Sequence, residues 1–146
     1  GMMWFDPRPG GPNSIAPGKR PLSNMCPTIV RRGDGHLFAL GASGGRRIMP
    51  AVFQLVSFLT DFGMCLDEAM HTPRIDYSGS GVVTANNALD AEILAGLQAE
   101  FDTQALYDSV YPSYFACPNV SAFDVANQLG SGAAFVTSPW AEAVRA

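Results

Sequence analysis

The feature that most constrains this fold is an apolar strand-like segment that runs through a glycine pair into a long apolar helical pattern. Residues 36–40 read HLFAL, Gly44 and Gly45 follow closely, and apolar residues then recur at helical spacing as far as Phe62. A strand, a glycine turn and a helix in this order expose backbone N–H groups at the helix start. Such groups can hold an anion or a developing oxyanion, so the sequence predicts an anion-binding turn at Gly44 and Gly45.

The helix predicted after this turn covers residues 45–63. Pro50 fits only in a first turn, so the regular helix is expected to begin near Met49. Phe53 and Phe58 make the helix apolar almost all round, which predicts burial between a sheet and a second layer. The apolar residues at helical spacing are Ile48, Val52, Leu55, Val56, Leu59 and Phe62.

The rest of the chain supplies short strands and helices. Residues 26–32 and 36–40 predict a hairpin around a Gly-Asp-Gly turn, and their apolar character predicts a sheet covered on both faces. A short helix is expected at 66–70, and an amphipathic helix is expected at 88–101 with Asp90 as a cap near its start. Further strands are expected at 74–77, 82–84, 120–126 and 133–137, the last two separated by Gly130, Ser131 and Gly132. Residues 105–114 are ambiguous.

These elements predict a single domain over residues 1–146 with a layered α+β fold. Its first 18 residues are rich in proline and glycine, which predicts an extended surface loop. The chain is long enough to bury a real core, and its composition, 47% hydrophobic and 15% charged, is that of a globular protein. We found no internal repeat.

Composition also excludes several function classes. A net charge of −4 argues against nucleic acid as the partner. Three separated cysteines and the absence of CxxC or HExxH motifs predict no metal site, and no motif implies a cofactor. The longest apolar run, around residues 48–62, is shorter than a membrane span requires, and no signal peptide is visible.

Three motifs resemble a known family. PGKRPLSNMCPTIV, GASGGRRI and FLTDFGMCLDEAMHTPRID occur in the order seen in the C-terminal part of the small subunit of gamma-glutamyltranspeptidases. The resemblance covers about residues 2–77 well and the remainder weakly. The family consists of N-terminal-nucleophile (Ntn) hydrolases with an αββα sandwich, which cleave themselves so that a new N-terminal Thr attacks a gamma-glutamyl amide. The chain begins after the position of that Thr, so the resemblance implies part of the sandwich, lacking the segment that carries the nucleophile.

The resemblance also implies site residues. Gly44 and Gly45 match the pair that forms the family's oxyanion hole; without the flanking motifs, the pair would read as an ordinary strand–helix turn. The two residues after Pro-Leu are commonly both Ser and bind the α-carboxylate of the glutamyl group. Ser23 matches this pattern, whereas Asn24 departs from it with an amide that can still donate hydrogen bonds. Both could instead cap the loop before the strand.

Trp4 departs from the family in a different way. Many glutamyl-specific members carry an acidic residue near this place, which holds the ammonium group of the substrate. Trp4 cannot form that ion pair, although Asp6 is near in sequence. A specificity for other acyl amides, as in the related cephalosporin acylases, is therefore an alternative.

The other reactive side chains are expected to have structural or surface roles. Arg46 and Arg47 could bind a substrate carboxylate, but a surface pair is the favoured interpretation. Cys26 lies within a strand pattern and is expected to be a buried small hydrophobe. His36 and His71 have no linked nucleophile, so both are expected to be structural or surface residues. Arg74 is a candidate for an ion pair with Asp67 or Asp76.

Two functional hypotheses follow. In the first, the chain is part of an amidohydrolase or acyltransferase of glutathione metabolism, acts on a gamma-glutamyl or other acyl amide, and is inactive alone because an upstream segment supplies the Thr. A periplasmic or secreted parent is compatible with the family. In the second, it is a non-catalytic scaffold or ligand-binding domain of a truncated gene. Phosphate binding at GASGGRR is disfavoured because neither GxGxxG nor GxxxxGK[ST] occurs. Incomplete sheets would expose apolar edges, so self-association is expected.

Overall fold

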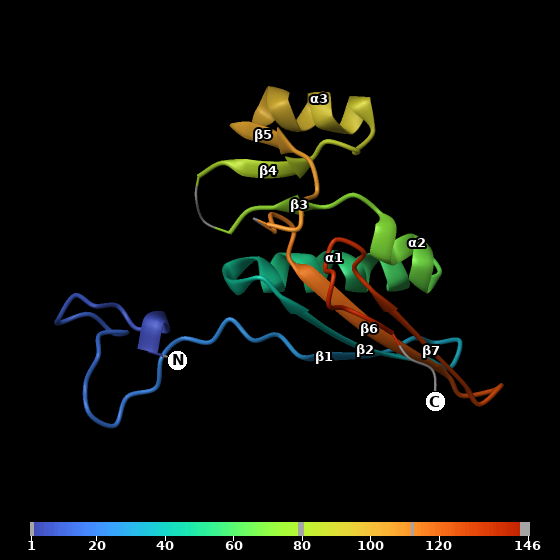
Figure 1. The fold of residues 1–146 in the computed structure, drawn as a ribbon, viewed down its shortest axis with the longest axis horizontal. Helices are drawn as coiled ribbons and strands as arrows, with labels where there is room; N and C mark the ends of the chain where they lie inside the picture. The colour runs from blue at the N-terminus through green and yellow to red at the C-terminus, as the bar shows by residue number, and fades with distance from the viewer. Residues whose placement is uncertain (1, 79–80, 112, 144–146) are drawn as a thin grey trace.

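The computed structural model describes residues 2–78, 81–111 and 113–143 (Figure 1). These residues form an antiparallel four-stranded sheet in the order β1-β2-β6-β7 and a smaller sheet in the order β3-β4-β5. The chain enters through a long loop that opens with a short 3₁₀ helix, η1 (Met2–Trp4), and extends away from the rest of the molecule. The α+β prediction is confirmed, and the sheets and helices are layered.

The hairpin predicted at the start of the large sheet is present. β1 (Thr28–Arg31) pairs antiparallel with β2 (His36–Ser43). Gly35 takes a φ of +92° in the turn, and the Arg32 N–H donates to the His36 carbonyl at 2.8 Å. β2 continues three residues beyond its predicted end, because it also pairs along its whole length with β6 (Cys117–Asp124).

Helix α1 (Ile48–Thr60) covers one face of the large sheet, as Figure 1 shows. Pro50 lies in its first turn, as predicted, because the missing N–H has no intrahelical acceptor there. Leu55 and Leu59 are fully buried, and burying each such side chain contributes roughly 1.5–3 kcal/mol. The second helix of this layer, α2 (Leu66–His71), begins with a capping box formed by Cys65 and Glu68. The shared core contains Phe38, Leu40, Ile48, Val52, Leu55, Leu59, Ala69, Met70, Val120, Ala122 and Phe135.

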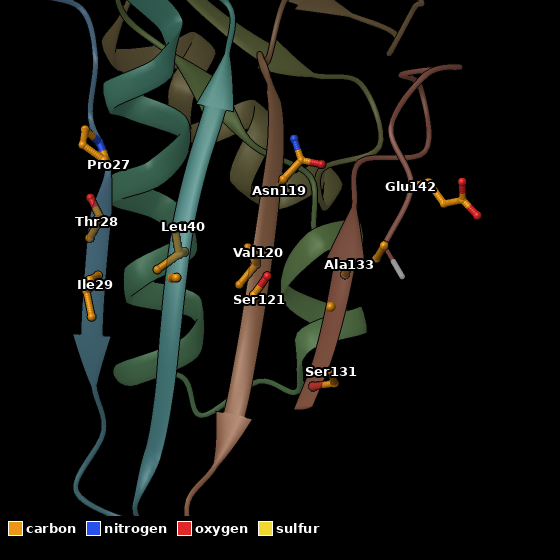
Figure 2. Close-up of a pocket in the computed structure, with 13 residues that line it drawn as sticks. Pro27, Thr28, Ile29, Leu40, Asn119, Val120, Ser121, Ser131, Ala133 and Glu142 are labelled. Atoms are coloured by element: carbon orange, nitrogen blue, oxygen red, sulfur yellow. The ribbon is translucent and has the colours of Figure 1, made fainter. Parts of the chain in front are cut away.

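The prediction that both faces of this sheet are covered is wrong for the described residues. Figure 2 looks onto the face turned away from α1 and α2, and the side chains of Ala39 and Ser121 on this face are exposed. Ile29 is 83% exposed there. It lies in register with Ala39, which pairs with Ser121, which pairs in turn with Gly132. The central row of the open face is therefore built mostly from small side chains.

The burial predicted for α1 is also only partly right. Phe53 on its outer side is 73% exposed, and Met49 is 66% exposed. Gln54 connects α1 to the small sheet. Its amide nitrogen donates to the carbonyl of Ile75 at 2.8 Å, and its amide oxygen accepts from the N–H of the same residue at 2.9 Å. The helix therefore contacts both sheets.

The C-terminal hairpin pairs β6 with β7 (Leu129–Ala134), and its turn is not where the sequence placed it. Gly130, Ser131 and Gly132 lie inside β7, while the chain reverses at residues 125–128. The carboxylate of Asp124 accepts from the N–H groups of Ala126 and Asn127 at 2.9 and 3.1 Å, and these bonds stabilise the turn.

The small sheet contains β3 (Ile75–Asp76), β4 (Val83–Asn86) and β5 (Thr103–Leu106). β4 and β5 are parallel, and α3 (Ala91–Glu100) makes the crossover that parallel strands require. The predicted helix and its Asp90 cap are confirmed, because the Asp90 carboxylate accepts from the Glu92 N–H at 2.8 Å. β5 was not predicted. No residue of α3 is buried, and Phe101, just after it, is 53% exposed.

Candidate active site

The turn between β2 and α1 has a backbone shape that requires glycine at both predicted positions. Gly44 has a φ of +153° and Gly45 a φ of +63°, and side chains disfavour both conformations. A methyl group at Gly44 would also lie 2.6 Å from the Cβ of Ala116. The glycine pair is therefore fixed by backbone conformation and by close packing.

Gly45 begins a one-turn 3₁₀ helix, η2 (Gly45–Arg47), that leads directly into α1. The Arg47 N–H donates to the Gly44 carbonyl at 3.2 Å and closes this turn. The first N–H groups of a helix have no acceptor within it and lie at the positive end of its dipole. This geometry can stabilise a developing negative charge.

The PLSN motif lies against the glycine turn. The side-chain amide of Asn24 donates to the Gly45 carbonyl at 3.2 Å, so the structure brings Asn24 and Gly45 together. Ser23 is exposed, and its oxygen accepts from the Met25 N–H at 3.2 Å. The hydroxyl of Ser23 keeps its own proton for a further acceptor. Local loop bonding and ligand binding are therefore compatible at this residue.

A pocket of about 770 Å³ opens beside these motifs, a size that suits a small ligand. The aromatic ring of Trp4 forms part of its wall, and one ring carbon lies 3.8 Å from where a Cβ on Gly45 would stand. Gly44 and Gly45 do not themselves line the pocket, but they adjoin it through Asn24 and Trp4. Its lining includes Trp4, Ser23, Asn24, Cys26, Arg46 and Met49.

The charges at this pocket are unequal. Arg46 is exposed at the wall. Asp6 also lines the pocket, but its carboxylate accepts from the Arg8 N–H at 2.9 Å within its own loop. The wall is otherwise rich in aromatic and thioether groups, including Phe5, Met25 and Met49. Arg46 is therefore the less engaged of the two charged residues that line a largely apolar pocket.

Arg47 is partly exposed, with 37% of its side chain accessible, but it also contacts two distant segments. Its Nε lies 3.7 Å from the carboxylate of Asp76, and its Nη1 donates to the Ser113 carbonyl at 3.4 Å. Its guanidinium also lies 5.8 Å from the ring centroid of Tyr114. No local pattern in the sequence indicates these contacts, because Arg47 and Ser113 are 66 positions apart.

Arg74 is 2% exposed, and its predicted partners are wrong among the described residues. Its guanidinium stacks 4.4 Å from the ring centroid of Phe135 and donates to the carbonyls of Met70 and Phe115 at 3.2 and 3.5 Å. Burial lowers the pKa of Arg74 below its ordinary value, and the charge of Asp108 opposes that shift.

The two acids predicted to pair with Arg74 have other partners. Asp67 lies 3.3 Å from His71 on α2, and Asp76 faces Arg47. His36 lies 3.1 Å from the Asp34 carboxylate at the hairpin end. This contact agrees with the expectation that His36 is a structural or surface residue. Cys26 is half-buried rather than buried, and its sulfur lies 3.7 Å from the Thr28 hydroxyl.

Two absences apply to the part of the chain that the structure describes. Within residues 2–78, 81–111 and 113–143, no group of three or more His, Cys, Asp or Glu side chains is arranged to hold a metal ion. None of the helices in these ranges is both long and apolar enough to cross a membrane.

The fold and the turn define the class of protein. A solved structure of a highly active tryptophan-to-aspartate mutant of gamma-glutamyltranspeptidase from Pseudomonas nitroreducens superposes with a TM-score of 0.69. The match covers 94% of this chain and 70% of that chain at 26% identity. The layered α+β arrangement is thus that of an Ntn hydrolase.

The family is shown by the sequence itself. The family profile described as Gamma-glutamyltranspeptidase matches residues 2–115, and the chain belongs to this family of hydrolases and transferases. Glutathione hydrolase proenzyme of Bacillus subtilis subsp. natto is 34% identical over 93 residues, and Acylase ACY 1 proenzyme of Pseudomonas sp. strain SE83 is 38% identical over 98 residues. These matches cover 64% and 67% of this chain but only 16% and 17% of the two relatives.

Proposed function

We propose that this chain is the C-terminal part of the small subunit of a gamma-glutamyltranspeptidase-like amidohydrolase or acyltransferase. In this proposal the N–H groups of Gly44 and Gly45 form the oxyanion hole, and Ser23 and Asn24 bind the acyl group. The observation that carries the proposal is the hydrogen bond from Asn24 to the Gly45 carbonyl, which joins the two motifs at the rim of one pocket.

The reaction would run in two steps on a Thr supplied by another segment. The Thr oxygen attacks the amide carbonyl carbon while its proton passes to the free amine of the same residue. The carbonyl electrons move to oxygen, and the glycine turn stabilises that negative charge. The C–N bond then breaks, the leaving amine takes the proton, and an acyl ester remains. Water or a second amine attacks the ester, releases the acyl group and restores the Thr.

The open face of the large sheet supports the need for that second segment. Ile29 is 83% exposed in a row otherwise made of small side chains. Facing sheets of a sandwich pack about 10 Å apart, and small residues allow that approach. Pro27, Asn119 and Glu142 frame a hollow on the same face (Figure 2). We infer that a sheet of the Thr-bearing segment covers this face, and that the chain alone is inactive.

The acyl group that we propose lacks an ammonium. Trp4 forms a wall beside Gly45, and the carboxylate of Asp6 is engaged by its own loop. Arg46 offers a positive charge to a carboxylate. Among the relatives, one is named an acylase and another a glutathione hydrolase. The test of this proposal therefore compares an acyl group that carries an ammonium with one that lacks it.

Calorimetric titration of the chain tests this function. Glutarate and glutamate differ only in the ammonium group, and we expect glutarate to bind at least as tightly. Ser23→Ala should abolish binding of both, and the chain alone should release no aniline from a gamma-glutamyl anilide. Absence of binding at millimolar ligand would support the non-catalytic scaffold instead.

Substituting Trp4 tests the acyl specificity separately. Trp4→Asp should shift the preference toward glutamate by about tenfold, which corresponds to one added ion pair of roughly 1.4 kcal/mol. The matched control is Trp140→Asp, since Trp140 is 87% exposed and does not line this pocket. An unchanged preference in Trp4→Asp would contradict the role of Trp4. A solved relative described as a highly active tryptophan-to-aspartate mutant makes this substitution a natural choice.

A further inference from the structure

The glycine turn is packed against a segment far along the chain. Ala116 is fully buried, and its Cβ lies so close to Gly44 that only a glycine fits there. Ala116 itself has a φ of +57°, which is unusual for a residue with a side chain. The packing of residues 113–116 therefore has a direct influence on the shape of the turn.

Two arginines bind the carbonyl groups of this segment. Arg47 donates to the Ser113 carbonyl at 3.4 Å, and Arg74 donates to the Phe115 carbonyl at 3.5 Å. Arg47 also belongs to the turn, because its own N–H donates to the Gly44 carbonyl. One residue thus contacts both the turn and the segment that covers it.

Asp76 forms an ion pair with the side chain of Arg47. It is 5% exposed on β3, and its Oδ2 accepts from the Ser78 hydroxyl at 2.8 Å and lies 3.7 Å from Nε of Arg47. Within the described part of the chain, Oδ1 of Asp76 and Nε of Arg47 have no hydrogen-bond partner. A buried carboxylate with one oxygen lacking a hydrogen bond is stabilised mainly by a nearby positive charge. Moving Arg47 away would therefore leave Asp76 uncompensated.

We propose that Arg47 and Asp76 are positioning residues that hold the Gly44–Gly45 turn in the shape needed to bind an oxyanion. The pair would act through residues 113–116 and would not touch the substrate. This inference rests on the proposed function for its catalytic consequence, but the positioning of the turn can be measured without turnover.

The first test is made on the chain alone by NMR. Asp76→Asn should shift the amide resonances of Gly44 and Gly45 and accelerate their hydrogen exchange at least tenfold, while Asp76→Glu should restore part of the protection. Asp67→Asn is the matched control, because Asp67 is exposed and pairs with His71 on α2. Unchanged Gly44 and Gly45 amides in Asp76→Asn, with the fold intact, would overturn the proposal.

The second test uses the chain assembled with the segment that carries the Thr nucleophile. Asp76→Asn and Arg47→Lys should lower kcat about tenfold or more and leave KM within about twofold. Affinity for a boronic acid analogue, whose Thr adduct is a tetrahedral anion, should fall by the same factor as kcat. Active-site titration corrects for misfolded enzyme. Equal losses in kcat and in titrated sites would mean a merely structural role.

The two proposals fail in different ways. If the unsubstituted assembly neither turns over an acyl anilide nor forms the boronate adduct, the proposed function fails, and the NMR result alone decides the positioning role. If the assembly is active and Asp76→Asn retains the parent kcat and boronate affinity, the positioning role fails and the proposed function stands.

Discussion

Ala116 lies directly against Gly44, so that a methyl group on Gly44 would stand 2.6 Å from the Cβ of Ala116 and 2.9 Å from its backbone α-carbon. Both distances are shorter than any real Cβ tolerates, and the φ of +153° adds backbone strain. The turn and the segment that covers it are therefore packed backbone against backbone.

Gly44→Ala should lower the free energy of unfolding by roughly 1–3 kcal/mol, the cost of a strained backbone conformation, measured by urea denaturation. Gly41→Ala is the control, since no atom would lie within 4 Å of its added methyl group. Adding Ala116→Gly to Gly44→Ala should recover only part of the loss, because the clash with the backbone of residue 116 persists. Equal stability of Gly44→Ala and Gly41→Ala would contradict the observed packing.

Arg74 should be important for stability because its guanidinium is almost completely buried. Arg74→Ala removes the stacking on Phe135 and leaves the Met70 and Phe115 carbonyls without their donor. We expect a loss of at least about 2 kcal/mol in urea denaturation.

Two companion variants sharpen this test. Arg74→Met fills the volume and keeps a contact with the aromatic ring, so it should lose less stability than Arg74→Ala. Arg31→Ala, at an exposed strand position, should change stability by no more than about 0.5 kcal/mol. A similarly small effect for Arg74→Ala would contradict the buried role.

The open face of the large sheet should drive self-association of the isolated chain. Ile29→Asp places a charge on the edge strand of that face, at its most exposed apolar side chain, and should shift sedimentation velocity profiles toward monomer at a given concentration. Ile93→Asp is the matched control, because Ile93 is also exposed but lies on α3. A strictly monomeric parent chain at all concentrations would remove the basis for this expectation.

The β6–β7 turn should weaken in acid. The hydrogen bond from the Asn127 side chain, joined by the Asn127 and Ala126 N–H groups, lowers the pKa of Asp124. A carboxyl whose pKa is lower in the folded chain stabilises it above the unfolded value of about 3.9, and that contribution is lost as pH falls through the folded value.

Hydrogen exchange at Ala126 and Asn127 measures this directly. Protection of both amides should fall below about pH 4 in the parent chain and depend much less on pH in Asp124→Asn. Asp67→Asn should behave like the parent. A parent-like pH dependence in Asp124→Asn would show that another group controls the turn.

Local patterns in the sequence predicted the hairpin of β1 and β2 and the start of α1, because both depend on neighbours a few residues away. The turn at 125–128 was missed because Gly130, Ser131 and Gly132 looked like the stronger turn, whereas the carboxylate of Asp124 decides where the chain reverses. β5 was missed because its four residues become a strand only by pairing in parallel with β4.

The candidate site also contains residues that local sequence patterns predicted and contacts that they did not. Gly44, Gly45, Ser23 and Asn24 belong to motifs that are short in sequence, so their resemblance to a family could be recognised. The contacts of Arg47 with Asp76 and Ser113 connect distant segments, and no local pattern encodes them. The assignment of Arg74 to an acid was wrong because its principal partners are carbonyl groups and an aromatic ring.

The long-range contact between Arg47 and Ser113 has a consequence for biosynthesis. The two residues are 66 positions apart, so a ribosome finishes the GASGG sequence well before it makes the segment that shapes it. At about 5–20 residues per second the interval lasts several seconds. During that time the nascent chain carries the motif without its final geometry, and any product that ends before Ser113 would keep that state permanently.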